Sequence, residues 1–286
     1  MSATRPVLEH DWLAASRAAT DALRAILRAA GTQAERVEET GTRGGGGDRT
    51  LVIDADAEAA VFAQLDALHA RGARFTAISE ERGQVDFGTA GEPPLVIIDP
   101  IDGSTNAKRG LPHHALSIAV ADGPTMADVV FGYVYDFGPG EEWHAVRGGG
   151  AFLDGRPLVD CPRERHATDG RLELVAIESS RPEYVAGAQA GLSAHVHRMR
   201  AIGSIAVSLC QLAATRVDGM VALWRTRSVD AAAAQLVVRE SGGLVTFALD
   251  PEDDPLAAPL ADLDARLHLV AARTPETLAR LAELPV

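Results

Sequence analysis

The feature that most constrains the fold is an apolar run, VII at residues 96–98, that ends directly in two carboxylates. The run predicts a buried strand, and Asp99 and Asp102 follow it three residues apart. Pro100 favours extended backbone at Asp99, and Gly103 permits a sharp turn, so the two side chains are expected to converge where the strand ends. In open α/β sheets, ligands bind at this end of the strands. We therefore expect a sheet protein with a site at that edge.

The order of the other segments predicts a layered α/β fold. Residues 11–30 and 54–72 have apolar residues at helical spacing, with a glycine-rich loop between them, so two helices are expected before the first strand. Strand patterns broken by turn residues follow at residues 74–81, 94–99, 114–123, 127–137 and 141–155. Strands are then expected at 172–180, 218–224 and 267–272, alternating with helices at 204–215, 229–243 and 275–284. Such an order is typical of α+β and α/β layers.

A polar, turn-rich segment, DCPRERHATDGR at residues 160–171, is the best candidate for a boundary between two halves. The first half, residues 1–160, is expected to be an α+β unit that carries the two carboxylates. The second half, residues 161–286, is expected to be an α/β unit that carries a further acid, Asp230. A chain of 286 residues is long enough to bury a sizeable core.

The composition narrows the class of protein. Apolar residues make up 47% of the chain and charged residues 23%, as in ordinary globular proteins. The net charge of −13 argues against a protein that follows a nucleic-acid backbone, because such binding needs a basic surface. No apolar run approaches the roughly 20 residues of a membrane span, and the N-terminus lacks an apolar segment after its first basic residue. We therefore expect a cytoplasmic protein that binds neither nucleic acid nor membranes.

More acids stand at the ends of other predicted elements. Glu80 and Glu81 end the strand at 74–81, and Asp230 begins the helix at 229–243. With the two aspartates after the central strand, these acids suggest a site for a hard cation, which prefers oxygen ligands. The alternative is a solvated turn, because Asp-Pro and Asp-Gly are common turn dipeptides whose carboxylates cap the backbone.

Three segments, ISEERG, DPIDGSTNAKRGLP and SVDAAAAQLVVRESGG, resemble in order and spacing the signature regions of the inositol monophosphatase-like, magnesium-dependent phosphatases. The segments DRTLVIDADAE, GAFLDGRPL and MRAIGSIAVSLCQLA extend the likeness through nearly the whole chain. The resemblance implies an alternating αβαβα sandwich of the sugar-phosphatase type. It also implies that residues 1–160 carry the catalytic loop and the DPIDGST metal site, and residues 161–286 the substrate side.

The resemblance further implies a set of metal ligands. In this sequence they are the side chains of Glu80, Asp99, Asp102 and Asp230 and the backbone carbonyl of Ile101. Two Mg²⁺ ions would offset these carboxylates and activate the attacking water. A third, weaker Mg²⁺ is implied at Asp54, together with Asp48 and shared with Glu80, while Arg43 would contact the substrate phosphate under the closed glycine-rich loop.

Catalytic and substrate-side roles come from the same resemblance. Glu80 and the hydroxyl of Ser104 are expected to orient and help deprotonate the attacking water, Asp54 to help place it, and Asp230 to lie near the leaving alkoxide. The residues assigned to phosphate and substrate are Asp102, Gly103, Ser104, Arg200, Gly203 and Ser204. Backbone N–H groups at the helix start after Gly103 would receive phosphate oxygens. Two alternatives stay open: Ser104 as a helix cap and Arg200 as a solvated surface charge.

The expected substrates are small polyol or sugar phosphates. Val229, Ala107 and the position of Thr50 resemble the archaeal-type branch, whose members hydrolyse both inositol monophosphate and fructose 1,6-bisphosphate. Leu223 and Trp224 stand where inositol-selective members tend to place an acid, so strict selectivity for inositol is not expected. A 3'-phosphonucleotide or histidinol phosphate stays an alternative substrate.

Two functions of other classes are alternatives to hydrolysis. A non-catalytic metal-binding scaffold is disfavoured because all the ligand positions are intact. A nucleotide-dependent transferase is disfavoured because no GxxxxGK[ST] loop is present. The expected partner is a small phosphorylated substrate, and the resemblance also implies a homodimer.

Overall fold

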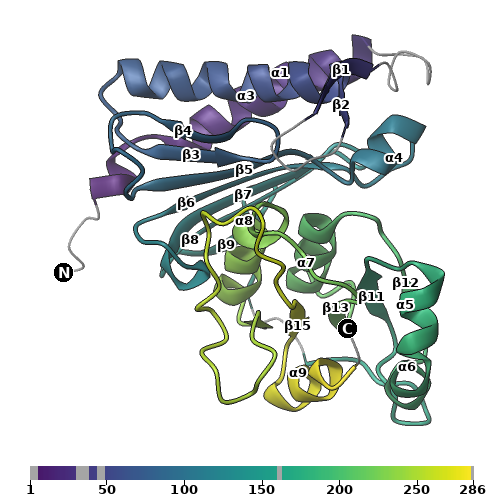
Figure 1. The fold of residues 1–286 in the computed structure, drawn as a ribbon. Helices are drawn as coiled ribbons and strands as arrows, with labels where there is room; N and C mark the ends of the chain where they lie inside the picture. The colour runs from purple at the N-terminus through teal and green to yellow at the C-terminus, as the bar shows by residue number, and fades with distance from the viewer. Residues whose placement is uncertain (1–5, 30–38, 44–48, 160–162, 285–286) are drawn as a thin grey trace.

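Helices and strands alternate in five layers, as Figure 1 shows in the computed structural model, which describes residues 6–29, 39–43, 49–159 and 163–284. Helices α1 (Trp12–Ala29) and α3 (Val52–Ala70) cover one face of an eight-stranded sheet. Helices α7 (Ile205–Ala213) and α8 (Ser228–Glu240) separate this sheet from a five-stranded one. The outer layer contains α5 (Pro182–Gly187), α6 (Gln189–His195) and α9 (Pro275–Ala282). The predicted αβαβα sandwich is confirmed.

The eight-stranded sheet has the order β10-β9-β8-β7-β6-β5-β3-β4. Its strands are β3 (Thr76–Ser79), β4 (Gly83–Asp86), β5 (Leu95–Asp102), β6 (Ala115–Ala121), β7 (Val129–Asp136), β8 (Glu141–Val146), β9 (Gly150–Leu153) and β10 (Arg156–Pro157). Among these strands β3 and β5 run parallel, with Ser79 opposite Ile98, and the other neighbours are antiparallel. The register therefore brings the residues that follow β3 next to Asp99 on β5.

The five-stranded sheet has the order β12-β11-β13-β15-β14. Its strands are β11 (Val175–Glu178), β12 (Met199–Arg200), β13 (Gly219–Ala222), β14 (Leu244–Thr246) and β15 (Val270–Ala272). Strands β11, β12 and β13 are parallel, because helices connect them on the sheet faces. The sequence patterns missed the short elements β4, β12, β14, α5 and α6, which are too brief to establish a period.

The central helix α8 is buried on nearly all sides, and four consecutive alanines, 231–234, let it lie very close to the larger sheet. A Cβ built on Gly132 of β7 would lie 2.5 Å from the carbonyl oxygen of Ala233. The surrounding core combines Ile97 of β5 with Val207 of α7 and other residues of both predicted halves. The proposed boundary at residue 160 falls outside the described residues, so the division into halves stays a prediction.

The segment between α1 and α3 differs from its prediction as a loop. Strands β1 (Glu39–Arg43) and β2 (Arg49–Leu51) pair there as an antiparallel hairpin. The two threonines of ETGTR at 39–43 favour extended backbone, a signal that the neighbouring glycines masked. The four glycines and Asp48 lie outside the described residues, and so does the predicted closing loop that they form.

The described ranges also contain two 3₁₀ helices, η1 (Pro6–Glu9) before α1 and η2 (Met126–Asp128) before β7. None of the helices in the described ranges is long and apolar enough to cross a membrane.

Candidate active site

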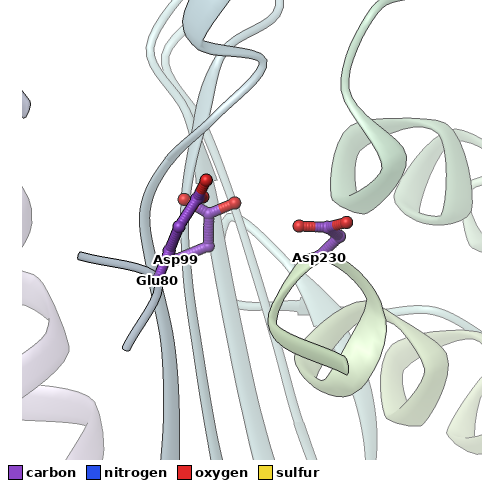
Figure 2. Close-up of side chains that lie close together, drawn as sticks. All are labelled: Glu80, Asp99 and Asp230. Atoms are coloured by element: carbon purple, nitrogen blue, oxygen red, sulfur yellow. The ribbon is translucent and has the colours of Figure 1, made fainter. Parts of the chain in front are cut away.

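Three carboxylates converge between the larger sheet and α8. Glu80 follows β3, Asp99 lies on β5 and Asp230 lies in the first turn of α8, and each offers an oxygen within 4.8 Å of the others. Figure 2 shows Glu80 and Asp99 side by side, facing Asp230. The parallel pairing of β3 and β5 places Glu80 beside Asp99. The packing of α8 against the sheet brings Asp230 close to both. The sequence prediction that these acids meet at a strand end agrees with this geometry.

A bulge in β5 directs the acids of the DPID segment inward. The register with β6 shifts between Asp99, opposite Ser117, and Asp102, opposite Ala115. The Oδ1 atom of Asp99 accepts a hydrogen bond from the Ile101 backbone N–H at 3.0 Å, which stabilises the turn. As a result, Asp99 is only 2% exposed and Asp102 only 7%.

One carboxylate oxygen of Asp102 is held by the start of α7. Its Oδ2 atom accepts hydrogen bonds from Ser204 Oγ at 2.6 Å and from the Ala206 backbone N–H at 2.7 Å. Burial and the charge of Asp230 raise the pKa of Asp102 to about 8, although these hydrogen bonds lower it. Asp102 therefore connects β5 to the start of α7.

The electrostatics of the carboxylate group favour a bound cation. Burial, followed by the charges of Glu80, Asp102 and Asp230, raises the pKa of Asp99 well above its ordinary value. Burial also raises the pKa of Asp230, and Arg227 partly offsets it. Closely spaced carboxylates repel one another, and their oxygens are the donors that Mg²⁺ and similar hard cations prefer. The residues present therefore fit a divalent-metal site.

A polar cavity of about 320 Å³ opens beside these acids. Its lining residues are Asp54, Glu80, Glu81, Asp99, Pro100, Ile101, Ser104, Thr105 and Lys108. Lys108 Nζ lies 3.6 Å from Asp54 Oδ2, so a cation faces the acid that the sequence assigned to a third metal ion. Sequence reasoning gave Lys108 and Thr105 no role, because only their place on the short helix α4 (Ser104–Arg109) brings them to the cavity.

Gly103 makes the tight connection between β5 and α4. It has a φ of +85°, and a Cβ here would lie 2.9 Å from the carbonyl oxygens of both Gly203 and His113. Gly103, not Ser104, is the N-cap of α4, and no side chain caps the helix. The helix-cap alternative for Ser104 is therefore wrong, and its side chain lines the cavity instead.

Three residues assigned to the substrate side, Arg200, Gly203 and Ser204, lie outside the lining of this cavity. Arg200 is exposed, donates to the carbonyl oxygen of Met199 and lines a separate groove of about 560 Å³. The hydroxyl of Ser204, which is 1% exposed, is engaged by Asp102. The Gly203 backbone N–H donates to the carboxylate of Glu178. Their contact with substrate stays a prediction.

Two residues of this region escaped sequence reasoning. Arg227 donates from Nη1 to Glu80 Oε1 at 2.6 Å, and its place three residues before Asp230 is the only signal that the sequence offers. Glu178, at the end of β11, is 3% exposed and accepts hydrogen bonds from Ile202 N–H, Gly203 N–H and Ser208 Oγ. It holds the loop that leads to Ser204, which in turn holds Asp102.

The pH dependence of stability should reveal the ionisation of Glu178. Burial raises its pKa from 4.5 to about 7, so the folded protein keeps a proton that the unfolded chain loses in this range. The contribution of this group to the free energy of unfolding should therefore fall as pH rises from about 4.5 to about 7, by up to roughly 3 kcal/mol. Urea unfolding of Glu178→Gln should show a correspondingly smaller loss across that range than the parent. Glu183→Gln, at an exposed glutamate, is the control and should lose as much stability as the parent over this pH range. If the free energy of unfolding fell equally with pH in the parent and in Glu178→Gln, Glu178 would not be the group responsible.

Comparison with known proteins decides the family. The model of the inositol monophosphatase family matches residues 7–283. The chain belongs to the inositol monophosphatase family. A member of this family from Methanothermobacter thermautotrophicus, named fructose-1,6-bisphosphatase/inositol-1-monophosphatase, is 33% identical over 268 residues, which cover 90% of each chain.

SuhB proteins are also similar. Nus factor SuhB of Escherichia coli is 34% identical over 206 residues, covering 71% of this chain and 73% of that protein. The crystal structure of the extragenic suppressor protein SuhB from Bartonella henselae superposes with a TM-score of 0.71 at 27% identity, covering 94% of this chain and 96% of that one. The fold described above is therefore shared with the SuhB protein of Bartonella henselae.

Proposed function

We propose that this protein is a Mg²⁺-dependent phosphomonoesterase that hydrolyses small polyol or sugar phosphates, with inositol monophosphate and fructose 1,6-bisphosphate as the leading substrates. The convergence of Glu80, Asp99 and Asp230 beside a polar cavity carries this proposal. The relative that carries both enzyme names supports the choice of substrates.

The metal ligands proposed here are the side chains of Glu80, Asp99, Asp102 and Asp230 and the carbonyl of Ile101. Bound divalent cations would lower the pKa of the attacking water and stabilise charge on the phosphoryl and leaving oxygens. Glu80 and Ser104 line the cavity. They would orient that water and help to deprotonate it, with the Glu80 carboxylate as the group that accepts the proton. The backbone N–H groups after Gly103 would bind phosphate oxygens. Arg200, Gly203 and Ser204 stay proposed substrate-side residues.

Release of inorganic phosphate tests this function. Inositol 1-phosphate and fructose 1,6-bisphosphate should each yield phosphate with Mg²⁺, and a chelator should abolish the reaction. Full activity in EDTA would reject the metal mechanism. Absence of release with every monoester and cation tried would favour a non-catalytic scaffold, and a requirement for ATP would favour a transferase.

The substrate pocket is expected to be permissive. Leu223, at the position where an acid would bind ring hydroxyls, is 1% exposed and packs in the core beside the outer helices. We expect kcat/KM for inositol 1-phosphate and fructose 1,6-bisphosphate to differ by less than about 10⁴-fold, or roughly 5.5 kcal/mol. A panel of phosphate monoesters at fixed Mg²⁺ measures this ratio and includes a 3'-phosphonucleotide and histidinol phosphate. A larger preference for either leading substrate would contradict permissiveness.

Asp54 is proposed to bind a third, weaker Mg²⁺, with Asp48 and Glu80 as further ligands. It lies in the first turn of α3, lines the cavity and is 12% exposed in its side chain. Asp54→Ala should raise the Mg²⁺ concentration needed for half-maximal activity more than it lowers stability. A helix cap alone would instead cost about 1 kcal/mol of stability and leave the Mg²⁺ dependence unchanged. Mg²⁺ titrations of kcat and urea unfolding separate the two.

Cytoplasmic location and a homodimer remain part of the same proposal.

A further inference from the structure

Arg227 bridges the two sides of the carboxylate group. Its Nη1 lies 2.6 Å from Glu80 Oε1, beside the sheet, and its Nη2 lies 3.5 Å from Asp230 Oδ1, on α8. Its own backbone N–H donates to the other oxygen of Asp230, Oδ2, at 3.1 Å. A single side chain thus contacts two of the three acids that Figure 2 shows facing one another.

The backbone at the start of α8 fixes the position of Arg227. It immediately precedes α8, and Asp230 in the first turn of that helix holds the Arg227 backbone. The Arg227 side chain is only 21% exposed, so it is not a freely solvated surface arginine. An arginine side chain stays protonated in proteins, so Arg227 is a permanent cation.

Arg227 occupies oxygens that a divalent ion would also use, namely one of Glu80 through its side chain and both of Asp230 through its side chain and backbone N–H. A Mg²⁺ ligand oxygen lies about 2.0–2.1 Å from the ion, and a guanidinium hydrogen bond to that oxygen brings a second positive charge within a few ångströms. The two cations repel each other at that distance, so the charge of Arg227 weakens binding of the divalent ion.

We propose that Arg227 competes with the divalent cation for Glu80 and Asp230. In the cation-free protein its guanidinium holds the two acids together, and it must withdraw from them when the cation binds. Arg227 thereby sets the cation affinity of the site. This inference rests on the proposed metal-dependent function.

The test measures Mg²⁺ binding directly, by calorimetry on the full chain after chelation and dialysis. Arg227→Met should bind Mg²⁺ about 10-fold more tightly or better than the parent, because it removes the competing charge. Without Mg²⁺ the same variant should have a lower Tm, and Mg²⁺ should raise that Tm by more than it does in the parent. Arg227→Lys keeps one charge but cannot reach both acids in the same way, so its affinity should lie between the two.

Arg225 supplies a matched control for loss of one positive charge. It lies two residues away, is exposed and makes no ion pair with any residue in the described ranges. Arg225→Met should bind Mg²⁺ within about 2-fold of the parent, because a solvated charge is well screened. An equal gain in Arg225→Met and Arg227→Met would overturn direct competition.

A chemical test covers the case in which Arg227→Met is unstable. In Arg227→Ala, millimolar guanidinium ion should weaken Mg²⁺ binding by refilling the space between Glu80 and Asp230, whereas the parent should not respond. Unchanged or weaker Mg²⁺ binding in the folded Arg227 variants would overturn the inference while leaving the proposed function intact. A parent that binds no Mg²⁺ and releases phosphate in EDTA would reject both.

Discussion

Asp230→Asn should reduce kcat/KM for phosphate monoesters by more than about 10²-fold, since loss of even an outer partner of a metal ligand costs 10- to 100-fold. The amide keeps the shape of the side chain and an oxygen that can accept the hydrogen bond from the Arg227 backbone, but it removes the charge. Asp99→Asn should have the same effect. The loss should coincide with weaker Mg²⁺ binding in calorimetry, because both residues are proposed ligands.

Asp99→Asn and Asp230→Asn should lose activity without losing stability in the absence of Mg²⁺. Burial raises the pKa of both Asp99 and Asp230, so their ionised forms are unfavourable in the folded, cation-free protein. Replacement by the neutral amide should therefore leave the free energy of unfolding in EDTA unchanged or higher. Urea unfolding with and without Mg²⁺ measures this, and the stabilisation by Mg²⁺ should disappear.

Asp218 is a control residue whose replacement should lower stability without changing Mg²⁺ binding. It is fully buried, accepts hydrogen bonds from the Arg165 and Leu174 backbone N–H groups and pairs with Arg273, outside the cavity residues. Asp218→Asn should lower stability by a few kcal/mol, because it breaks a buried ion pair, and should leave Mg²⁺ affinity unchanged. Asp230→Asn with full activity and normal Mg²⁺ binding would show that Asp230 is not a metal ligand.

The sequence predicted those parts of the site that depend on strand ends. An apolar run followed by acids predicts the end of a strand, and parallel pairing of two such strands sets Glu80 beside Asp99. The predicted end was too early at one strand, because β5 continues through a bulge to Asp102. Asp230 was found because an acid in the first turn of a helix is also a local pattern. These features depend on neighbouring residues and on a repeated period, so the sequence carries them directly.

Other parts of the site depend on contacts between distant segments. Asp102 and Ser204 are separated by 102 residues, and their hydrogen bond follows from the packing of α7 against the larger sheet. Arg227 and Glu80 are 147 residues apart, so no local pattern predicts which arginine reaches the acids. The hairpin of β1 and β2 was missed for a related reason, because short strands beside glycines have no clear period.

Gly103 depends both on a local sequence pattern and on contacts with distant segments. Its replacement should cause a large loss of stability. The sequence predicted a sharp turn there, and the structure adds a close approach of two backbone segments to its Cα. A β-carbon would introduce the strain of a left-handed residue, about 1–2 kcal/mol, and a clash with two carbonyl oxygens that costs about 1–3 kcal/mol more. Gly103→Ala should therefore lower the free energy of unfolding by about 2–5 kcal/mol in total.

Gly242 separates the two contributions to that loss. Its φ is +88°, nearly that of Gly103, but a β-carbon there would meet nothing within 4 Å. Gly242→Ala should cost only the backbone strain of about 1–2 kcal/mol and leave Mg²⁺ affinity unchanged. Gly103→Ala should in addition weaken Mg²⁺ binding, because relief of the clash with Gly203 must move either Asp102 or the loop that holds it. Equal losses of stability in the two variants, with equal Mg²⁺ affinity, would show that the close approach at Gly103 does not constrain the site.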